Sequence, residues 1–130
     1  MELGRIEVVH SAGTSVVALH GEHDLSTVPE VERGIRGVLD SGSPLVVDLT
    51  SAAFIDSSVL GVIIAGHRRS VETLERAIAV VVAADSASDR LAKLVSLDTI
   101  VPTFATRDEA IEFAASGGEP SSAADGALPV

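Results

Sequence analysis

The chain has 130 residues, 46% of them hydrophobic, and a formal net charge of −10 at pH 7. This length and apolar content suit one globular domain with a substantial core. Because the chain is strongly acidic and has three Phe but no Tyr or Trp, the composition argues against nucleic acids and anionic membrane surfaces as partners and favours a protein with a basic face.

Cofactors and secretion are not indicated by the sequence. The chain has no Cys, which excludes disulfide bonds and thiolate metal sites, and its four His show no metal-ligand spacing. No Gly-rich phosphate loop is present, so we expect no bound nucleotide. The longest apolar run, residues 77–84, is much shorter than the roughly 20 residues of a membrane-spanning helix, and residues 1–5 do not resemble a secretory signal. We therefore expect a soluble cytoplasmic protein without a metal or cofactor.

Strands and helices are predicted to alternate along most of the chain. Two antiparallel strands come first, and the strand, helix and strand that follow indicate parallel crossovers. The sequence therefore predicts an α/β domain over residues 1–116, with a mixed, mainly parallel sheet of about five strands and four helices, followed by a disordered tail over residues 117–130. The strands are expected over residues 3–10, 14–20, 45–49, 77–84 and 99–104, and the helices over about 27–40, 57–74, 86–95 and 106–116.

Local signals support several of these elements. Thr27 and Glu30 form a T-x-x-E capping box for the first helix. In the third helix, Leu91, Leu94 and Val95 are expected to face the core. Pro102 removes a donor from the strand ladder, so the last strand is predicted to lie at the edge of the sheet.

The triplet Asp56-Ser57-Ser58 is the most informative stretch of the chain. It opens the second long helix, where backbone N–H groups lack intrahelical partners and the helix dipole is positive. Ser57 is expected to be the N-cap residue. Two adjacent hydroxyls cannot both cap one helix, so Ser58 is left with a free hydroxyl in the first turn. Catalysis by Ser58 is not indicated, because His67 on the same helix is about 13 Å away.

One face of this helix is predicted to be a docking surface. Gly61, Val62 and Ala65 follow Ser58 at helical spacing, so they share its face and are small or apolar. Val59 and Val62 exceed what the core requires and are expected to be exposed. Exposed apolar residues beside a free hydroxyl indicate a surface that another protein approaches closely.

Two aspartates are predicted to lie near that surface. Asp24 and Asp56 each follow a strand, and the carboxyl ends of the two strands should meet at the same edge of the sheet, where open α/β sheets bind ligands. A turn or cap role and a contact with a partner are both open for each residue.

Two motifs resemble those of STAS domains, the module of bacterial anti-sigma factor antagonists that also occurs at the ends of sulphate transporters. Residues 54–62 read Phe-Ile-Asp-Ser-Ser-Val-Leu-Gly-Val, and residues 21–25 read Gly-Glu-His-Asp-Leu, where the family usually has Gly-Glu-apolar-Asp. Their separation and the order of elements also agree with that family. This chain differs at Val59, where Gly or another small residue is usual, and at His23, which replaces an apolar residue.

The resemblance implies a phosphorylation switch rather than an enzyme. Ser58 would be phosphorylated by a serine kinase that is also the anti-sigma factor. The unphosphorylated chain would bind this kinase and free a sigma factor, and a serine phosphatase would act on the phosphorylated form. The nucleotide would belong to the kinase. The residues expected to contact the partner are Asp24, Asp56, Ser57, Val59, Gly61, Val62 and Ala65.

One alternative function is a phosphorylation-independent STAS scaffold, such as a subunit of a stressosome or of a lipid-transport system. Such a scaffold would not need the Ser58 hydroxyl, so the hydroxyl favours the switch. The oligomeric state stays open between a monomer and a weak dimer.

Overall fold

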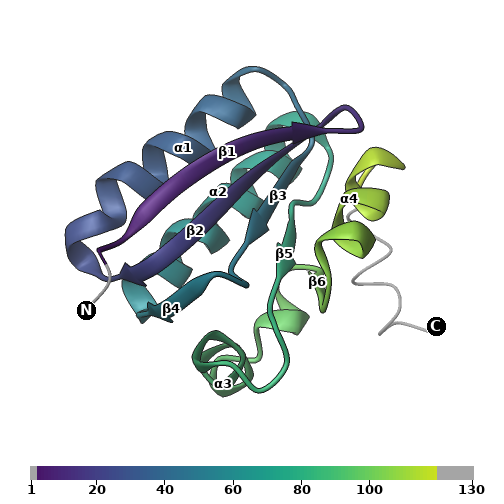
Figure 1. The fold of residues 1–130 in the computed structure, drawn as a ribbon. Helices are drawn as coiled ribbons and strands as arrows, with labels where there is room; N and C mark the ends of the chain where they lie inside the picture. The colour runs from purple at the N-terminus through teal and green to yellow at the C-terminus, as the bar shows by residue number, and fades with distance from the viewer. Residues whose placement is uncertain (1–2, 120–130) are drawn as a thin grey trace.

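Six strands and four α-helices make up the fold in the computed structural model, which describes residues 3–119 (Figure 1). The α/β class and the four helices agree with the sequence prediction. Most of the predicted tail, residues 120–130, lies outside the described residues. The elements are β1 (Arg5–Ser11), β2 (Thr14–His23), the 3₁₀ helix η1 (Leu25–Thr27), α1 (Val28–Asp40), β3 (Leu45–Asp48), β4 (Ala52–Ile55), α2 (Ser57–Leu74), β5 (Ala79–Val81), α3 (Ala87–Leu94), the 3₁₀ helix η2 (Leu97–Thr99), β6 (Thr103–Phe104) and α4 (Arg107–Ala115).

The strands form one mixed sheet in the order β1-β2-β3-β5-β6, and β4 extends it by pairing with β2. Strand β1 runs antiparallel to β2, and all the other described pairs are parallel. Strand β2 is long enough for two partners on the same side, because residues 15–18 pair with β3 and residues 21–23 pair with β4. The expected edge position of the last strand is confirmed, since β6 ends the order.

Strand β4 is absent from the sequence prediction, which gave about five strands. Only Ala52 and Ile55 of its four residues are buried, so the segment has no alternating apolar pattern. It is held by pairing with a strand that lies far earlier in the chain. The predicted strand over residues 99–104 is also too long, because residues 97–99 form a 3₁₀ helix and only residues 103–104 pair as β6.

Helices cover both faces of the sheet. Figure 1 shows α1 and α2 side by side against one face and α4 on the other, with α3 below β4. Side chains of the central strands alternate between the two cores. Val17 of β2 packs with the α1 and α2 core, whereas Val16 and Val46 pack with Ala110 of α4. Residues 16–19 of β2 are therefore buried on both faces of the sheet.

Helix α3 is oriented only partly as predicted, because Leu91 packs against the core whereas Leu94 and Val95 do not. Its side chains Ser88 and Ala92, one turn apart, are buried, whereas Leu94 is 82% exposed and Val95 is 40% exposed. The helix has only eight residues, and the spacing of its apolar side chains does not define its orientation. The expectation that Leu94 and Val95 point inward is wrong.

The predicted capping box of the first helix does not form. Thr27 makes no side-chain hydrogen bond to the backbone of α1. Its hydroxyl lies 3.0 Å from Nδ1 of His23, which is fully buried, and His23 Nε2 donates to the carbonyl oxygen of His20 at 2.9 Å. Both ring nitrogens of His23 therefore have partners, which explains how a polar side chain occupies a position that is usually apolar.

The imidazole of His67 is expected to make stability depend on pH. Partial burial, and to a smaller extent the charge of Arg68, holds the pKa of His67 below its ordinary value of 6.5, and its Nδ1 accepts a 3.4 Å hydrogen bond from the backbone N–H of Ile78. As the pH falls, His67 is thus protonated at a higher pH in the unfolded chain than in the native chain. Stability should be unaffected above that ordinary pKa and should fall as the pH drops below about 6.5.

This dependence can be measured by urea unfolding at about pH 7.5 and pH 5.5 for the wild type and His67→Gln. The variant retains the other histidines, so they cancel in the comparison. The wild type should lose more stability between the two pH values than the variant does. Equal losses in both proteins would show that His67 does not contribute.

Candidate functional site

The carboxyl ends of β2 and β4 bring the two predicted aspartates together. His23 and Ile55 are paired in register at the ends of these parallel strands, and the backbone N–H of Asp56 donates to the carbonyl oxygen of His23 at 3.2 Å. Asp24 and Asp56 are the next residues along each strand. The expectation that they share one edge of the sheet is confirmed.

Asp56 is the residue that caps helix α2. Its Oδ1 accepts hydrogen bonds from the backbone N–H of Ser58 at 3.0 Å and of Val59 at 3.2 Å. Its backbone is extended, as is usual for an N-cap. Ser57 is the first residue of the helix and is exposed, so its predicted role as the cap is wrong. The carboxylate is the better acceptor, because it meets two N–H groups at once.

The Ser58 hydroxyl donates to the same carboxylate, with 2.5 Å between Ser58 Oγ and Asp56 Oδ1. Ser58 is half-buried, so its hydroxyl is held in place but is not enclosed. It lies at the positive end of an 18-residue helix, where an added anion is tolerated. The site can therefore act chemically as a phosphate acceptor.

Asp24 repeats this arrangement at the end of β2. Its Oδ1 accepts from the backbone N–H of Ser26 at 2.9 Å and from the Ser26 hydroxyl at 2.5 Å. These two hydrogen bonds are the main reason that the pKa of Asp24 is held below its ordinary value, so the carboxylate is charged at neutral pH. Ser26 was not among the predicted site residues, although the spacing Asp-x-Ser occurs at both 24–26 and 56–58.

The predicted docking face of α2 is only partly exposed. Gly61 and Ala65 are exposed and Val62 is half-buried, as a docking surface requires. Val59 is completely buried within the core that α2 forms with the sheet. The expectation that Val59 is exposed is therefore wrong, and its side chain cannot contact a partner. We use the term α2 face for Gly61, Val62 and Ala65.

Apolar residues that the sequence did not indicate lie on the other side of Ser58. Phe54 is 46% exposed and Leu94 is 82% exposed, and both line a hollow of about 360 Å³ between β4 and α3. Asp56, Ser57 and Arg90 also line this hollow. Phe54 lies two residues before Asp56, but only the position of α3 reveals that Phe54 and Leu94 form one surface with the triplet.

Two further findings concern the part of the chain that the structure describes. No group of three or more His, Asp or Glu side chains in residues 3–119 is placed to hold a metal ion. Within the same residues, no helix combines the length and the apolar character needed to cross a bilayer.

Both the sequence and the fold resemble those of known proteins. The STAS domain family matches residues 5–110. Among curated proteins, no sequence matches the chain. The crystal structure of an anti-sigma factor antagonist from Mycobacterium paratuberculosis is 30% identical in sequence, with 86% of this chain and 94% of that chain covered and a TM-score of 0.75.

Two structures of SpoIIAA are similar in fold. The anti-sigma factor antagonist SpoIIAA in its unphosphorylated form is 21% identical, with 85% of this chain and 96% of that chain covered and a TM-score of 0.62. The Bacillus cell fate determinant SpoIIAA in the phosphorylated form is 22% identical, with 85% and 97% covered and a TM-score of 0.57. Since the family match extends over most of the chain and the mycobacterial relative is covered almost completely, the chain belongs to the STAS domain family.

Proposed function

We propose that this chain is an anti-sigma factor antagonist that is controlled by phosphorylation of Ser58. In the unphosphorylated form it binds a serine kinase that is also the anti-sigma factor, and a sigma factor is released. Phosphorylation of Ser58 ends this binding, and a serine phosphatase restores it. The chain is then a cytoplasmic regulator without catalytic activity, and the kinase supplies the nucleotide.

The observation that carries this proposal is the Ser58 hydroxyl, which is held 2.5 Å from the Asp56 carboxylate at the open end of α2. The family comparison supports it. The 30% identical mycobacterial protein is an anti-sigma factor antagonist. SpoIIAA, whose fold this chain shares, is known in both an unphosphorylated and a phosphorylated form.

The proposed switch acts on the surface and leaves the fold unchanged. A phosphoryl group adds about −1.5 to −2 charge at neutral pH. Next to Asp56, this charge would turn the Ser58 side chain away from the carboxylate and toward solvent, while the helix N-terminus still stabilises an anion. A partner that buries Asp24, Asp56 and Ser58 in one interface would then have to desolvate a third negative group, which weakens binding.

The proposed partner surface surrounds Ser58 on both sides. The α2 face lies on one side, and Ser57, Phe54 and Leu94 lie on the other. Asp24 and Asp56, at the adjacent ends of β2 and β4, supply charge to this surface. A mixture of this kind, with apolar anchors and a few charged groups, is typical of transient protein interfaces.

Phosphorylation with purified proteins tests the proposal. Each anti-sigma factor serine kinase encoded by the source organism is incubated with Mg-ATP and the wild-type chain, and the product is examined by intact-mass spectrometry. We expect one kinase to add one phosphoryl group to the wild type and none to Ser58→Ala. Ser26→Ala is the matched control, because Ser26 makes the same hydrogen bonds to Asp24 that Ser58 makes to Asp56.

Three outcomes would be decisive. Equal phosphorylation of Ser58→Ala and the wild type would reject Ser58 as the acceptor. Loss of phosphorylation in Ser26→Ala alone would move the acceptor to the Asp24 turn. Binding of a partner to both the wild type and Ser58→Ala, with no phosphorylation by any kinase, would favour the phosphorylation-independent scaffold.

A further inference from the structure

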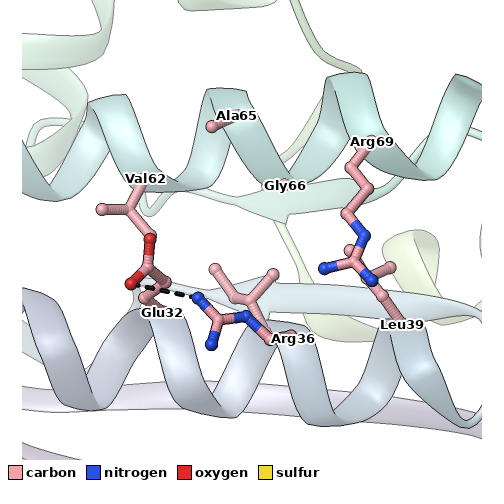
Figure 2. Close-up of a pocket in the computed structure, with 8 residues that line it drawn as sticks. Glu32, Arg36, Leu39, Val62, Ala65, Gly66 and Arg69 are labelled. Carbon is pink, nitrogen blue, oxygen red and sulfur yellow. Dashed lines mark ion pairs between the residues drawn. The ribbon is translucent and has the colours of Figure 1, made fainter.

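Helices α1 and α2 leave a groove between them on the outer side of the molecule. Its volume is about 110 Å³, and Figure 2 shows its residues on the facing sides of the two helices. The floor is apolar and the rim carries charged side chains. The residues that line it are Glu32, Ile35, Arg36 and Leu39 of α1 and Val62, Ala65, Gly66 and Arg69 of α2.

Small residues of α2 shape this groove. At Gly66 the two helices touch, because a Cβ atom there would lie only 2.8 Å from Cγ2 of Ile35. Ala65 is exposed and its short side chain leaves the mouth of the groove open. Ile35 and Leu39 are almost fully buried and form the floor. A single apolar recess therefore opens toward solvent at Ala65.

Arginines from both helices lie at the rim. Arg36 pairs with Glu32 at 3.3 Å, and Arg69 pairs with Asp40 at 2.7 Å. All four side chains are about half exposed, between 48% and 56%, and ion pairs as exposed as these contribute little to stability. Each guanidinium can therefore exchange its present carboxylate for another acidic group at little cost.

We propose that this groove receives one aliphatic side chain of the partner protein, with an adjacent acidic group of the partner bound by Arg69 and Arg36. The inference rests on the proposed function, because Val62 and Ala65 belong to the α2 face and also line the groove. A partner seated on the α2 face therefore covers the mouth of the groove. Its recognition surface extends from Ser58 along α2 to α1.

The size of the groove defines its occupant. A volume of about 110 Å³ equals that of about four water molecules, which is room for one branched aliphatic side chain but not for a nucleotide. The rim explains why an acidic neighbour is expected, although the chain as a whole has a net charge of −10. The partner should thus present an aliphatic residue beside Asp or Glu within its otherwise basic face.

A small probe tests the groove without any partner. We would titrate 4-methylpentanoate, which joins a leucine-like side chain to a carboxylate, into the ¹⁵N-labelled full chain and record amide shifts by NMR. We expect saturable shifts around Ala65 and Gly66, with a dissociation constant on the order of 10 mM. The shifts should be lost in Ala65→Leu, which fills the groove, and kept in Ala115→Leu, at an exposed alanine of α4. Shifts that do not saturate, or that persist in Ala65→Leu, would overturn the proposal.

The second experiment measures binding of the kinase that phosphorylates Ser58. Ala65→Leu should weaken its binding at least about tenfold, and Ala115→Leu should not change it. Normal binding of the kinase to Ala65→Leu would refute the groove as a partner site, but it would not contradict the proposed phosphorylation of Ser58. If 4-methylpentanoate nevertheless binds, the groove would be assigned to a small carboxylate instead. If no kinase phosphorylates the wild type, the proposed function fails, and with it the partner assignment, whatever the probe shows.

Discussion

Replacing Ser58 with aspartate is expected to weaken binding of the kinase at least about 100-fold. The new carboxylate would stand beside Asp56, whose Oδ1 now accepts the Ser58 hydroxyl at 2.5 Å, and close to the charged Asp24 turn. In a desolvated interface, a further like charge costs several kcal/mol. The fold should tolerate the change within about 1 kcal/mol, because a negative side chain in the first turn of α2 interacts favourably with the helix dipole.

Calorimetric titration with the kinase and thermal unfolding would measure the two effects separately. Ser11→Asp is the matched control, because it adds the same charge at the exposed end of β1, which pairs with the start of β2, whereas Asp24 follows the other end of β2. It should bind the kinase as the wild type does. A Ser58→Asp protein that melts far earlier than the wild type would show that Ser58 is required for the fold, and the interface explanation would fail.

Replacing Arg107 with alanine should lower the free energy of unfolding by about 3 kcal/mol. Arg107 Nε, at the start of α4, lies 2.7 Å from Oδ2 of Asp48 at the end of β3. The Asp48 side chain is 2% exposed, so its carboxylate would remain buried without a counter-ion. The loss belongs at the lower end of the range for buried pairs, because Arg107 itself is 38% exposed.

A second, more exposed ion pair in the same chain serves as the control for this effect. Arg69 and Asp40 also lie 2.7 Å apart, but both side chains are about half exposed. Arg69→Ala should cost less than about 1 kcal/mol in urea unfolding. Adding Asp48→Asn to Arg107→Ala should recover part of the lost stability, since the amide carries no charge. Similar losses for Arg107→Ala and Arg69→Ala would show that burial of Asp48 does not determine the energy of the pair.

The sequence predicted the corner of the molecule that holds the candidate site, because the relevant signals are local. The triplet Asp56-Ser57-Ser58 before an apolar helix defines one turn, and the motif over residues 21–25, just after the predicted strand over residues 14–20, defines the turn at Asp24. The family was also predicted from these two motifs and is confirmed. Each of these motifs spans only a few consecutive residues, so its recognition does not depend on how distant elements pack.

The errors arise where packing decides between residues that look alike in sequence. Asp56 and Ser57 are both good N-cap residues, and only the backbone path out of β4 selects Asp56. Val59 and Val62 both look like surplus apolar residues, yet the rotation of α2 against the sheet buries Val59. Leu94 is exposed for the same kind of reason, since the orientation of a short helix follows from its neighbours.

Strand β4 could not be predicted from its own four residues. It pairs with the far end of β2, and neither Ala53 nor Phe54 is buried. The groove between α1 and α2 was also not predicted, because it depends on the contact of Gly66 with Ile35 across two helices. Contacts of this kind are set by the tertiary fold and have no signal in a sequence window.

The pairing of β2 with β4 has a consequence for the folding of the chain. The turns at Asp24 and Asp56 are about 30 residues apart in the chain, with α1 and β3 between them, so the two strand ends meet only through a long-range pairing. Neither turn alone presents both carboxylates. A partner that contacts the two turns together would therefore bind only chains in which β2 and β4 have paired, and a chain without this pairing would not compete for it.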